Sequence, residues 1–287
     1  MTRSVLILLL VTLVWGTTFP LLKSASGDLN GVEISAFRFL VASLCMLPFL
    51  VKAPRRAWID GLLLGGLGLA SYVTQAYGLQ YISSNRSAFL TSLNVLMVPF
   101  LGLLFGARLP WPVLLAAFLA CLGVGLMSWE GGGHLLGDAA TIVCALAYAL
   151  YVIVLSQRSG RNEARHLAAT QILIMTILAW IWMLLQSVGS DALATLPHRV
   201  APHAVTLLYL GACATAGMLF LQAVGQRQVP AAKAAVIYAM EPVFAAGFGW
   251  LWLGEVLGWR GAAGGAIVIG ALMLSEMKPA QAKASTP

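Results

Sequence analysis

Long apolar runs, separated by short polar breaks, follow one another along the whole chain. A helix of roughly 20 apolar residues crosses a bilayer core of about 30 Å. Apolar windows of about this length lie at 4–22, 33–51, 60–81, 85–105, 111–129, 136–156, 167–187, 203–224, 231–253 and 259–276. These runs are continuous and do not alternate every second residue, which argues against a porin-like barrel. The pattern predicts an all-α membrane protein with ten transmembrane helices and no soluble domain.

The composition supports the same class. Of the 287 residues, 60% are hydrophobic and 9% are charged, whereas a soluble domain has roughly 25% charged residues. The four cysteines stand alone in separate apolar runs, without the spacing of a metal site or a disulfide framework. We find no nucleotide, metal or hydrolase motif in the context that such motifs need. We therefore expect no cofactor, no metal and no enzymatic activity.

The basic residues indicate how the chain lies in the membrane. If the N-terminus is placed in the cytoplasm, 12 Lys and Arg residues lie on the cytoplasmic side, 4 lie outside, and Arg38 lies within a span. The positive-inside rule then predicts that both termini are cytoplasmic, with residues 279–287 as a cytoplasmic tail. The net charge of +7 indicates contact with anionic lipid at the cytoplasmic rim, not with nucleic acid.

The second half of the chain weakly repeats the first. A shift of 147 residues places Asn94 on Glu241, and a shift of 133 aligns the helices at the start of each half. The repeat divides the chain into two halves, 1–130 and 131–278, of five helices each. Because five is odd, the halves must lie in the membrane with opposite orientations. Inverted repeats are typical of transporters, with the substrate site near the midplane between the halves.

Four motifs are spread over these runs: WGTTF at 15–19, Arg38-Phe39, LNVLMVPFLGLLF at 93–105 and MEPVFAAGFGWLWLGE at 240–255. With them the chain resembles the drug/metabolite transporter superfamily, in its ten-helix EamA branch, over all but the tail. The most specific motif, at 240–255, contains the acid-Pro pair Glu241-Pro242. The corresponding motif at 93–105 departs from it, because it has Asn94-Val95 at that place. The resemblance implies transport of small metabolites, often efflux, and several members export amino acids, including aromatic ones. These motifs are shared across many substrates, so they identify the fold better than the cargo.

Polar side chains in the fourth and ninth runs lie on corresponding helix faces. Thr91 and Asn94 stand three residues apart in one run, and Tyr238 and Glu241 stand three apart in the other, so each pair shares a face. Under the repeat, we expect the two faces to meet. Polar groups inside a bilayer usually face a cavity or a partner helix. Because such residues also join helices where there is no cavity, packing stays open as an alternative for Thr91 and Asn94.

Each of these two runs also contains a proline. Pro99 and Pro242 each remove a backbone hydrogen bond at membrane depth, so we predict a broken helix beside each polar face. Broken helices of this kind often form the wall of a substrate cavity. Glu241 is then either a structural acid that satisfies freed backbone groups or a site for a proton or a substrate ammonium group.

Further aromatic and amide side chains extend the candidate site. Arg38 lies about two turns inside its helix; it either snorkels or pairs with Glu33, or it receives a substrate carboxylate. The runs at 111–129 and 259–276 are rich in small residues and lack polar stripes, so we expect them to brace the scaffold. The predicted substrate-binding residues are Trp15, Thr18, Arg38, Tyr72, Gln75, Thr91, Asn94, Tyr148, Tyr151, Gln222, Tyr238 and Glu241.

A cavity lined by Tyr, Trp, Asn, Gln and Thr suits a neutral zwitterion and suits a phosphate ester poorly, since phosphate needs several Lys or Arg. We therefore predict a secondary transporter of a bacterial inner membrane. It exports zwitterionic metabolites, foremost amino acids with apolar or aromatic side chains, by alternating access. The alternatives are a multidrug or nucleotide-sugar exporter on the same fold, a membrane enzyme, and a non-transporting receptor. The expected partners are the substrate and the lipid bilayer. A monomer is plausible, and a dimer and proton coupling both stay open.

Overall fold

A computed structural model describes residues 3–82, 84–104, 106, 109–128, 134–188, 192–253 and 258–276, and these form helices, turns and short loops without a strand. Eight of the described helical segments are long and apolar enough to cross a membrane, and two shorter apolar helices, at Trp111–Leu126 and Trp259–Ser275, accompany them. The predicted all-α membrane protein of ten spanning segments is therefore confirmed. The inverted relation of the two halves stays a prediction.

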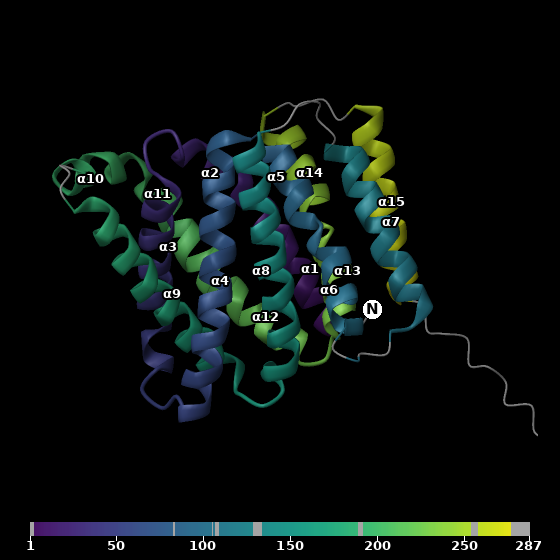
Figure 1. Cartoon of the computed structure of the whole chain (residues 1–287), viewed down its shortest axis with the longest axis horizontal. Helices are drawn as coiled ribbons and strands as arrows, with labels where there is room; N and C mark the ends of the chain where they lie inside the picture. Colours follow the sequence, from purple (N-terminus) through teal and green to yellow (C-terminus); the bar gives the residue numbers. More distant parts are fainter. Residues whose placement is uncertain are drawn as a thin grey trace, which may run out of the picture.

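The first half contains five spanning segments. In chain order its helices are α1 (Arg3–Gly16), α2 (Thr18–Ala25), α3 (Gly31–Met46), η1 (Leu47–Phe49), α4 (Arg55–Tyr81), α5 (Ser84–Ser92), α6 (Asn94–Leu104) and α7 (Trp111–Ser128). The first span is α1 with α2, and the fourth is α5 with α6. Figure 1 shows α4 and α8 side by side at the front of the bundle and α7 at its right-hand edge.

The second half contains the other five segments and one short additional helix. Its helices are α8 (Leu135–Ser159), α9 (Ala164–Ser187), α10 (Ala192–Val200), η2 (Ala201–His203), α11 (Ala204–Leu208), η3 (Tyr209–Gly217), α12 (Met218–Gln226), α13 (Ala231–Tyr238), α14 (Glu241–Leu253) and α15 (Trp259–Glu276). The eighth span runs from α11 through η3 to α12. The segment around α10 was expected to be a polar break and instead forms a helix of nine residues.

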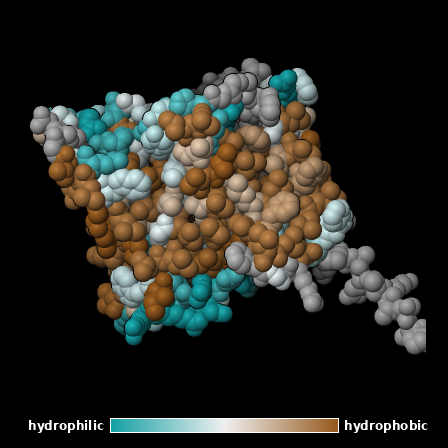
Figure 2. Space-filling model, in the orientation of Figure 1, coloured by the Kyte–Doolittle hydropathy of each residue, from teal (hydrophilic) through white to brown (hydrophobic). Residues whose placement is uncertain are grey.

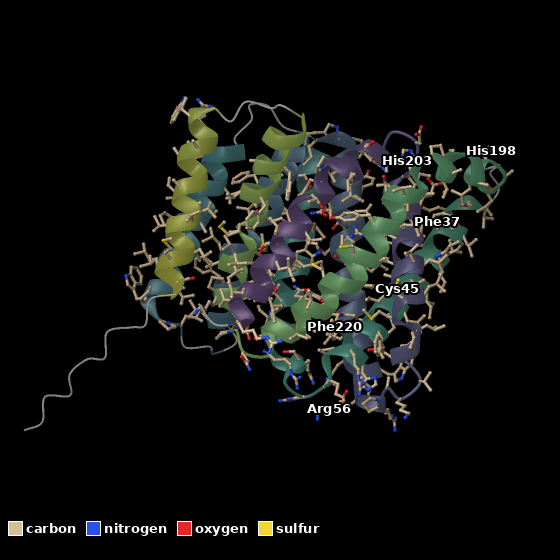
Figure 3. All side chains as sticks on the ribbon, turned by 180° about the vertical axis from the view of Figure 1, so that it is seen from behind. Phe37, Cys45, Arg56, His198, His203 and Phe220 are labelled. Atoms are coloured by element: carbon tan, nitrogen blue, oxygen red, sulfur yellow. The ribbon has the colours of Figure 1, made fainter. Side chains whose placement is uncertain are left out.

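The surface of the bundle carries an apolar belt between two polar ends, as Figure 2 shows. Large apolar side chains such as Leu104 (81% exposed) and Leu185 (69% exposed) project outward, which is favourable only where lipid covers them. In Figure 3, Arg56 lies at one end of the bundle and His203 at the opposite end. The belt and its polar ends fit a chain that spans a bilayer many times.

The pair formed by α7 and α15 packs closely at one edge of the bundle (Figure 1). A Cβ atom added to Gly123 would lie 2.7 Å from the carbonyl oxygen of Gly264 and 2.8 Å from Cγ2 of Val268. Only glycine at position 123 permits this approach of the two backbones. Among the described residues of this pair, no side chain belongs to the predicted substrate set.

The spans that carry the predicted polar faces are interrupted, but at positions other than the prolines. One break lies at Leu93, between α5 and α6, and Pro99 lies inside continuous α6. The prediction of a break at Pro99 is therefore wrong. The ninth span breaks at 239–240, and Pro242 is the second residue of α14. A proline in the first turn of a helix removes no hydrogen bond, because the N–H groups there have no partner in the helix.

Candidate functional site

The three helix breaks lie next to the predicted polar residues. α6 begins at Asn94, α14 begins at Glu241, and the first span breaks at Thr17, between α1 and α2. Asn94 and Glu241 thus occupy the same place, the first residue after a break, and are separated by the 147 residues of the proposed repeat. The start of α14 also lies against α1, since a Cβ on Gly16 would be 3.2 Å from the carbonyl oxygen of Glu241.

Four of the predicted aromatic residues form one cluster. The ring of Tyr148 lies 6.1 Å from that of Trp15, 5.9 Å from that of Tyr151 and 5.9 Å from that of Tyr238, measured between centroids. Trp15 and Tyr238 are themselves 5.9 Å apart. These separations are those of favourable aromatic pairs. The cluster joins α1, α8 and α13, so it combines residues of both halves.

Glutamine side chains hold the hydroxyl groups of this cluster. Gln222 on α12 donates its amide N–H to the hydroxyl of Tyr148 (3.1 Å) and accepts from the hydroxyl of Tyr151 (3.3 Å). Tyr151 has a single hydroxyl proton, which Oε1 of Gln222 shares with Oε1 of Gln171 on α9 (3.1 Å). The hydroxyl of Tyr238 donates to Oε1 of Gln226 (3.1 Å). Because Tyr148 accepts from Gln222, its own hydroxyl proton remains available to another acceptor.

A second polar group lies where α4, α5 and α8 meet. The amide of Gln75 donates to Oγ1 of Thr91 (3.3 Å), and the thiol of Cys144 lies 3.9 Å from that oxygen. Asn94 donates its amide N–H to the carbonyl of Thr91 (2.7 Å), while its Oδ1 is buried and has no partner among the described residues. A buried acceptor without a donor is uncommon in native structures and calls for an explanation.

Arg38 is buried (3% exposed), so it neither snorkels to the surface nor, as shown next, pairs with Glu33. Its Nε donates to Oγ1 of Thr215 (3.0 Å), and its guanidinium carbon lies 4.6 Å from the centre of the Tyr72 ring. The possible pairing with Glu33 is wrong, because Glu33 binds Arg199 at 2.6 and 2.8 Å and caps α3. In the described part of the chain, no carboxylate pairs with Arg38.

Glu241 is the acid of the site, and like Arg38 it has no ion-pair partner among the described residues. Its side chain is half-buried and makes no hydrogen bond or ion pair within the described residues. It lies close enough to Tyr72, Tyr148 and Tyr238 to interact electrostatically with all three. The alternative that Glu241 satisfies freed backbone groups therefore finds no hydrogen bond to support it.

Thr18 is the predicted residue whose hydroxyl turns away from the others. Its Oγ1 donates to the carbonyl of Trp15 (2.8 Å), within the first span. This bond satisfies the backbone beside the break at Thr17, which is a local structural role. Trp15 likewise donates its indole N–H to the carbonyl of Ala214 (2.9 Å), although its ring belongs to the aromatic cluster.

A cavity of about 340 Å³ lies directly beyond the polar residues. It is bounded by Val98 and Gly102 on α6, Ile153 and Ser156 on α8, and Pro230 before α13. Val98 stands one helical turn after Asn94, and Ile153 stands two residues after Tyr151. The cavity lies between these residues and the end of the bundle that the positive-inside rule predicts to be cytoplasmic. Its volume is in the range of small-molecule pockets.

Similarity of the amino-acid sequence to known families shows to which family this chain belongs. A sequence model of the EamA-like transporter family matches residues 2–129 and 135–277. The chain belongs to this family. It is therefore a multi-pass membrane transporter, as its apolar helices also indicate.

Individual relatives agree with the family and leave the cargo unspecified. An uncharacterized transporter of Archaeoglobus fulgidus is 28% identical over 253 residues, covering 87% of this chain and 78% of the relative. The uncharacterized transporter YdfC of Bacillus subtilis is 21% identical over 280 residues, covering 92% and 88%. One crystal structure matches with a TM-score of 0.77 at 18% identity, covering 96% of this chain and 98% of that one. At that identity the likeness shows the fold alone.

Several residues of this EamA-like transporter contact the site without having been predicted from its sequence. Cys144, which has neither metal-site nor disulfide spacing in the sequence, contacts Ser71 (3.4 Å) as well as Thr91. Thr215, Gln171 and Gln226 are almost fully buried and bind predicted residues. The 147-residue repeat, which pairs Gln75 with Gln222, does not point to these three residues. They could have been found only because each is a polar residue inside an apolar span.

Proposed function

We propose that this transporter exports small zwitterionic metabolites, foremost amino acids with apolar or aromatic side chains. The observation that carries the proposal is Glu241, which begins a helix in the site and has no hydrogen-bond or ion-pair partner among the described residues. An ionisable group without a partner in the membrane interior is unfavourable and is retained where it has a function. A substrate ammonium group is a suitable partner, and a proton is the other.

The surroundings of Glu241 suit an ammonium group that carries an apolar or aromatic body. The rings of Trp15, Tyr148 and Tyr238 offer aromatic faces, which attract cations and pack against aromatic side chains. Aromatic faces of this kind favour an amine-bearing metabolite over a sugar nucleotide, whose phosphates need several cationic side chains.

The same features support alternating access, which we propose takes place across a bacterial inner membrane. The cavity beyond the site opens toward the end with most Lys and Arg residues, which the positive-inside rule places in the cytoplasm. The breaks before Asn94 and Glu241 divide two spans into halves, α5 with α6 and α13 with α14, that can move separately. A substrate that enters from the cytoplasm and leaves after these halves move would be exported.

Efflux from proteoliposomes tests the proposal directly. Full-length protein is reconstituted, the vesicles are loaded with labelled phenylalanine, a sugar nucleotide or a quaternary-ammonium drug, and initial efflux is measured. We expect saturable efflux of phenylalanine that unlabelled tyrosine inhibits. Efflux of the sugar nucleotide or the drug, with none of phenylalanine, would overturn the proposal. Protein-free vesicles give the background leak of each solute.

A further inference from the structure

The eighth span contains a stretch of unusual helix that faces Arg38. Residues Tyr209–Gly217 form a π-helix, in which each hydrogen bond reaches back five residues, and such stretches are frequent at functional sites. Thr215 lies in it, is fully buried, and donates its hydroxyl proton to the carbonyl of Leu210 (2.7 Å), five residues earlier. With its proton committed to Leu210, the oxygen of Thr215 acts as the acceptor for Nε of Arg38.

The π-helical stretch lies in direct backbone contact with α3. A Cβ on Gly211 would be 2.6 Å from the carbonyl oxygen of Arg38 and 2.5 Å from Cβ of Val41. Glycine at this position therefore permits the two segments to approach closely. The close approach brings Thr215 within reach of Nε, so the direction of the guanidinium is set by the neighbouring span and by the Tyr72 ring beneath it.

This fixation leaves one edge of the guanidinium for a ligand. Only Nε of Arg38 has a hydrogen bond, and its two terminal nitrogens have no partner among the described residues. Neither terminal nitrogen is among the fully buried polar atoms that lack a partner, so each keeps some exposed surface. Two parallel N–H groups match the two oxygens of a carboxylate. A buried cation without a counter-ion is strongly unfavourable, which explains why an anionic group of a ligand would bind here.

Tyr72 connects this cation with the acid of the site. The Tyr72 ring lies under Arg38 and interacts electrostatically with both Arg38 and Glu241, yet the two charged groups form no ion pair with each other. An α-amino acid carries one group for each of them. We infer that Arg38 binds the carboxylate of the substrate through its terminal nitrogens, and that Thr215 is the positioning residue that directs them. This inference rests on the proposed function, since it assigns the second charged group of the zwitterion.

Three probes separate the two charged groups of the substrate. Phenylalanine carries both groups, phenethylamine carries only the ammonium, and 3-phenylpropionate carries only the carboxylate. Binding of each to the purified full-length protein is measured by equilibrium binding of labelled probe and by the rise in melting temperature. For Arg38→Gln, we expect the affinities for phenylalanine and 3-phenylpropionate to fall by about tenfold or more. The affinity for phenethylamine should stay within about twofold, and Arg56→Gln, at an exposed position, should change none of them.

A second variant protects the test against misfolding of Arg38→Gln. Thr215→Val keeps the shape of the side chain and the charge of Arg38 but removes the acceptor for Nε. It should weaken binding of the two carboxylate probes by about threefold to tenfold and leave phenethylamine unaffected. Equal loss of all three probes in the folded variants, or unchanged affinity for the carboxylates, would overturn the inference.

The outcomes also separate this inference from the proposed function. If the wild-type protein exports phenylalanine and Arg38→Gln binds it equally well, the carboxylate assignment alone is wrong. If the wild type binds 3-phenylpropionate through Arg38 but exports no amino acid, the proposed function fails while the carboxylate site stands. If the wild type binds none of the three probes, both are overturned.

Discussion

Arg86 and Asp138 form a two-pronged ion pair that ties the first turn of α5 to the first turn of α8. Nε of Arg86 lies 2.6 Å from Oδ1 of Asp138, and Nη2 lies 2.8 Å from Oδ2. The two side chains are 24% and 20% exposed. At the same end, His134 stacks on Tyr81 with 4.7 Å between ring centroids. These contacts hold α5 against α8 at the end opposite the cavity, so the pair must separate if the site is to open outward.

Exchanging the two charges tests the importance of this pair. Either Arg86→Asp or Asp138→Arg alone places like charges together and should lower the free energy of unfolding by about 1–3 kcal/mol, since the pair is only partly exposed. The double exchange should recover much of that loss. Thermal melting of the four proteins in one detergent measures the coupling. Additive losses without recovery would show that the pair contributes nothing specific.

The contact between α7 and α15 predicts a purely structural defect. Gly123→Leu forces a side chain against the backbone of Gly264, so it should destabilise the protein by roughly 1–3 kcal/mol. The order of preference among substrates should not change, because neither helix carries a residue of the predicted substrate set. Gly270→Ala on α15 is the control, since nothing lies within 4 Å of its position and alanine favours helix. A changed substrate preference in folded Gly123→Leu would show that this pair lines the path.

The orientation in the membrane is tested with single cysteines at opposite ends. Gly160 follows α8, and His198 lies in α10 at the other end (Figure 3). In a background without the exposed Cys45, a membrane-impermeant thiol reagent should label Gly160→Cys from the cytoplasm and His198→Cys from outside. Labelling of both from one side would contradict the ten-span topology, and labelling in the reverse order would contradict cytoplasmic termini.

The spans were predictable from the sequence because the bilayer imposes one requirement on every segment. Roughly 20 apolar residues are needed for each crossing, and polar residues have to lie between crossings or face inward. The candidate residues at Thr91, Asn94 and Glu241 were found by this reasoning. This reasoning succeeds because a polar side chain in an apolar span is unfavourable in lipid and therefore faces another helix or a cavity.

Other features depend on neighbours far away in the chain. Glu33 lies five residues before Arg38 and was an obvious partner, yet it pairs with Arg199, because the capping geometry at Asn30 turns its carboxylate toward the end of the bundle. The π-helix that presents Thr215 lies in close contact with α3 and has no sequence pattern of its own. The break at Leu93 needs no proline. Tertiary packing decided each of these, and local propensity could not reveal them.

Glu241→Gln separates the two readings of the acid. Glutamine keeps the size of the side chain and its capacity for hydrogen bonds but removes the charge. If Glu241 binds a substrate ammonium or a proton, initial efflux of phenylalanine from loaded proteoliposomes should fall by about tenfold or more, because a charged hydrogen bond contributes roughly 1.5–3 kcal/mol. If protons are coupled to transport, efflux should also lose its dependence on pH between mildly acidic and mildly alkaline buffers.

The control for this variant is its equivalent in the first half of the chain. Asn94 also begins a helix after a break, but it carries no charge, so Asn94→Ala removes hydrogen bonding without removing an acid. We expect a smaller loss of efflux, at unchanged pH dependence, with both variants compared at matched protein amounts and melting temperatures. Unchanged efflux in Glu241→Gln would make the acid structural. In this structure the side chain of Glu241 makes no hydrogen bond with the described residues. A structural role would therefore require hydrogen bonds in another conformation, and glutamine would have to form the same bonds there.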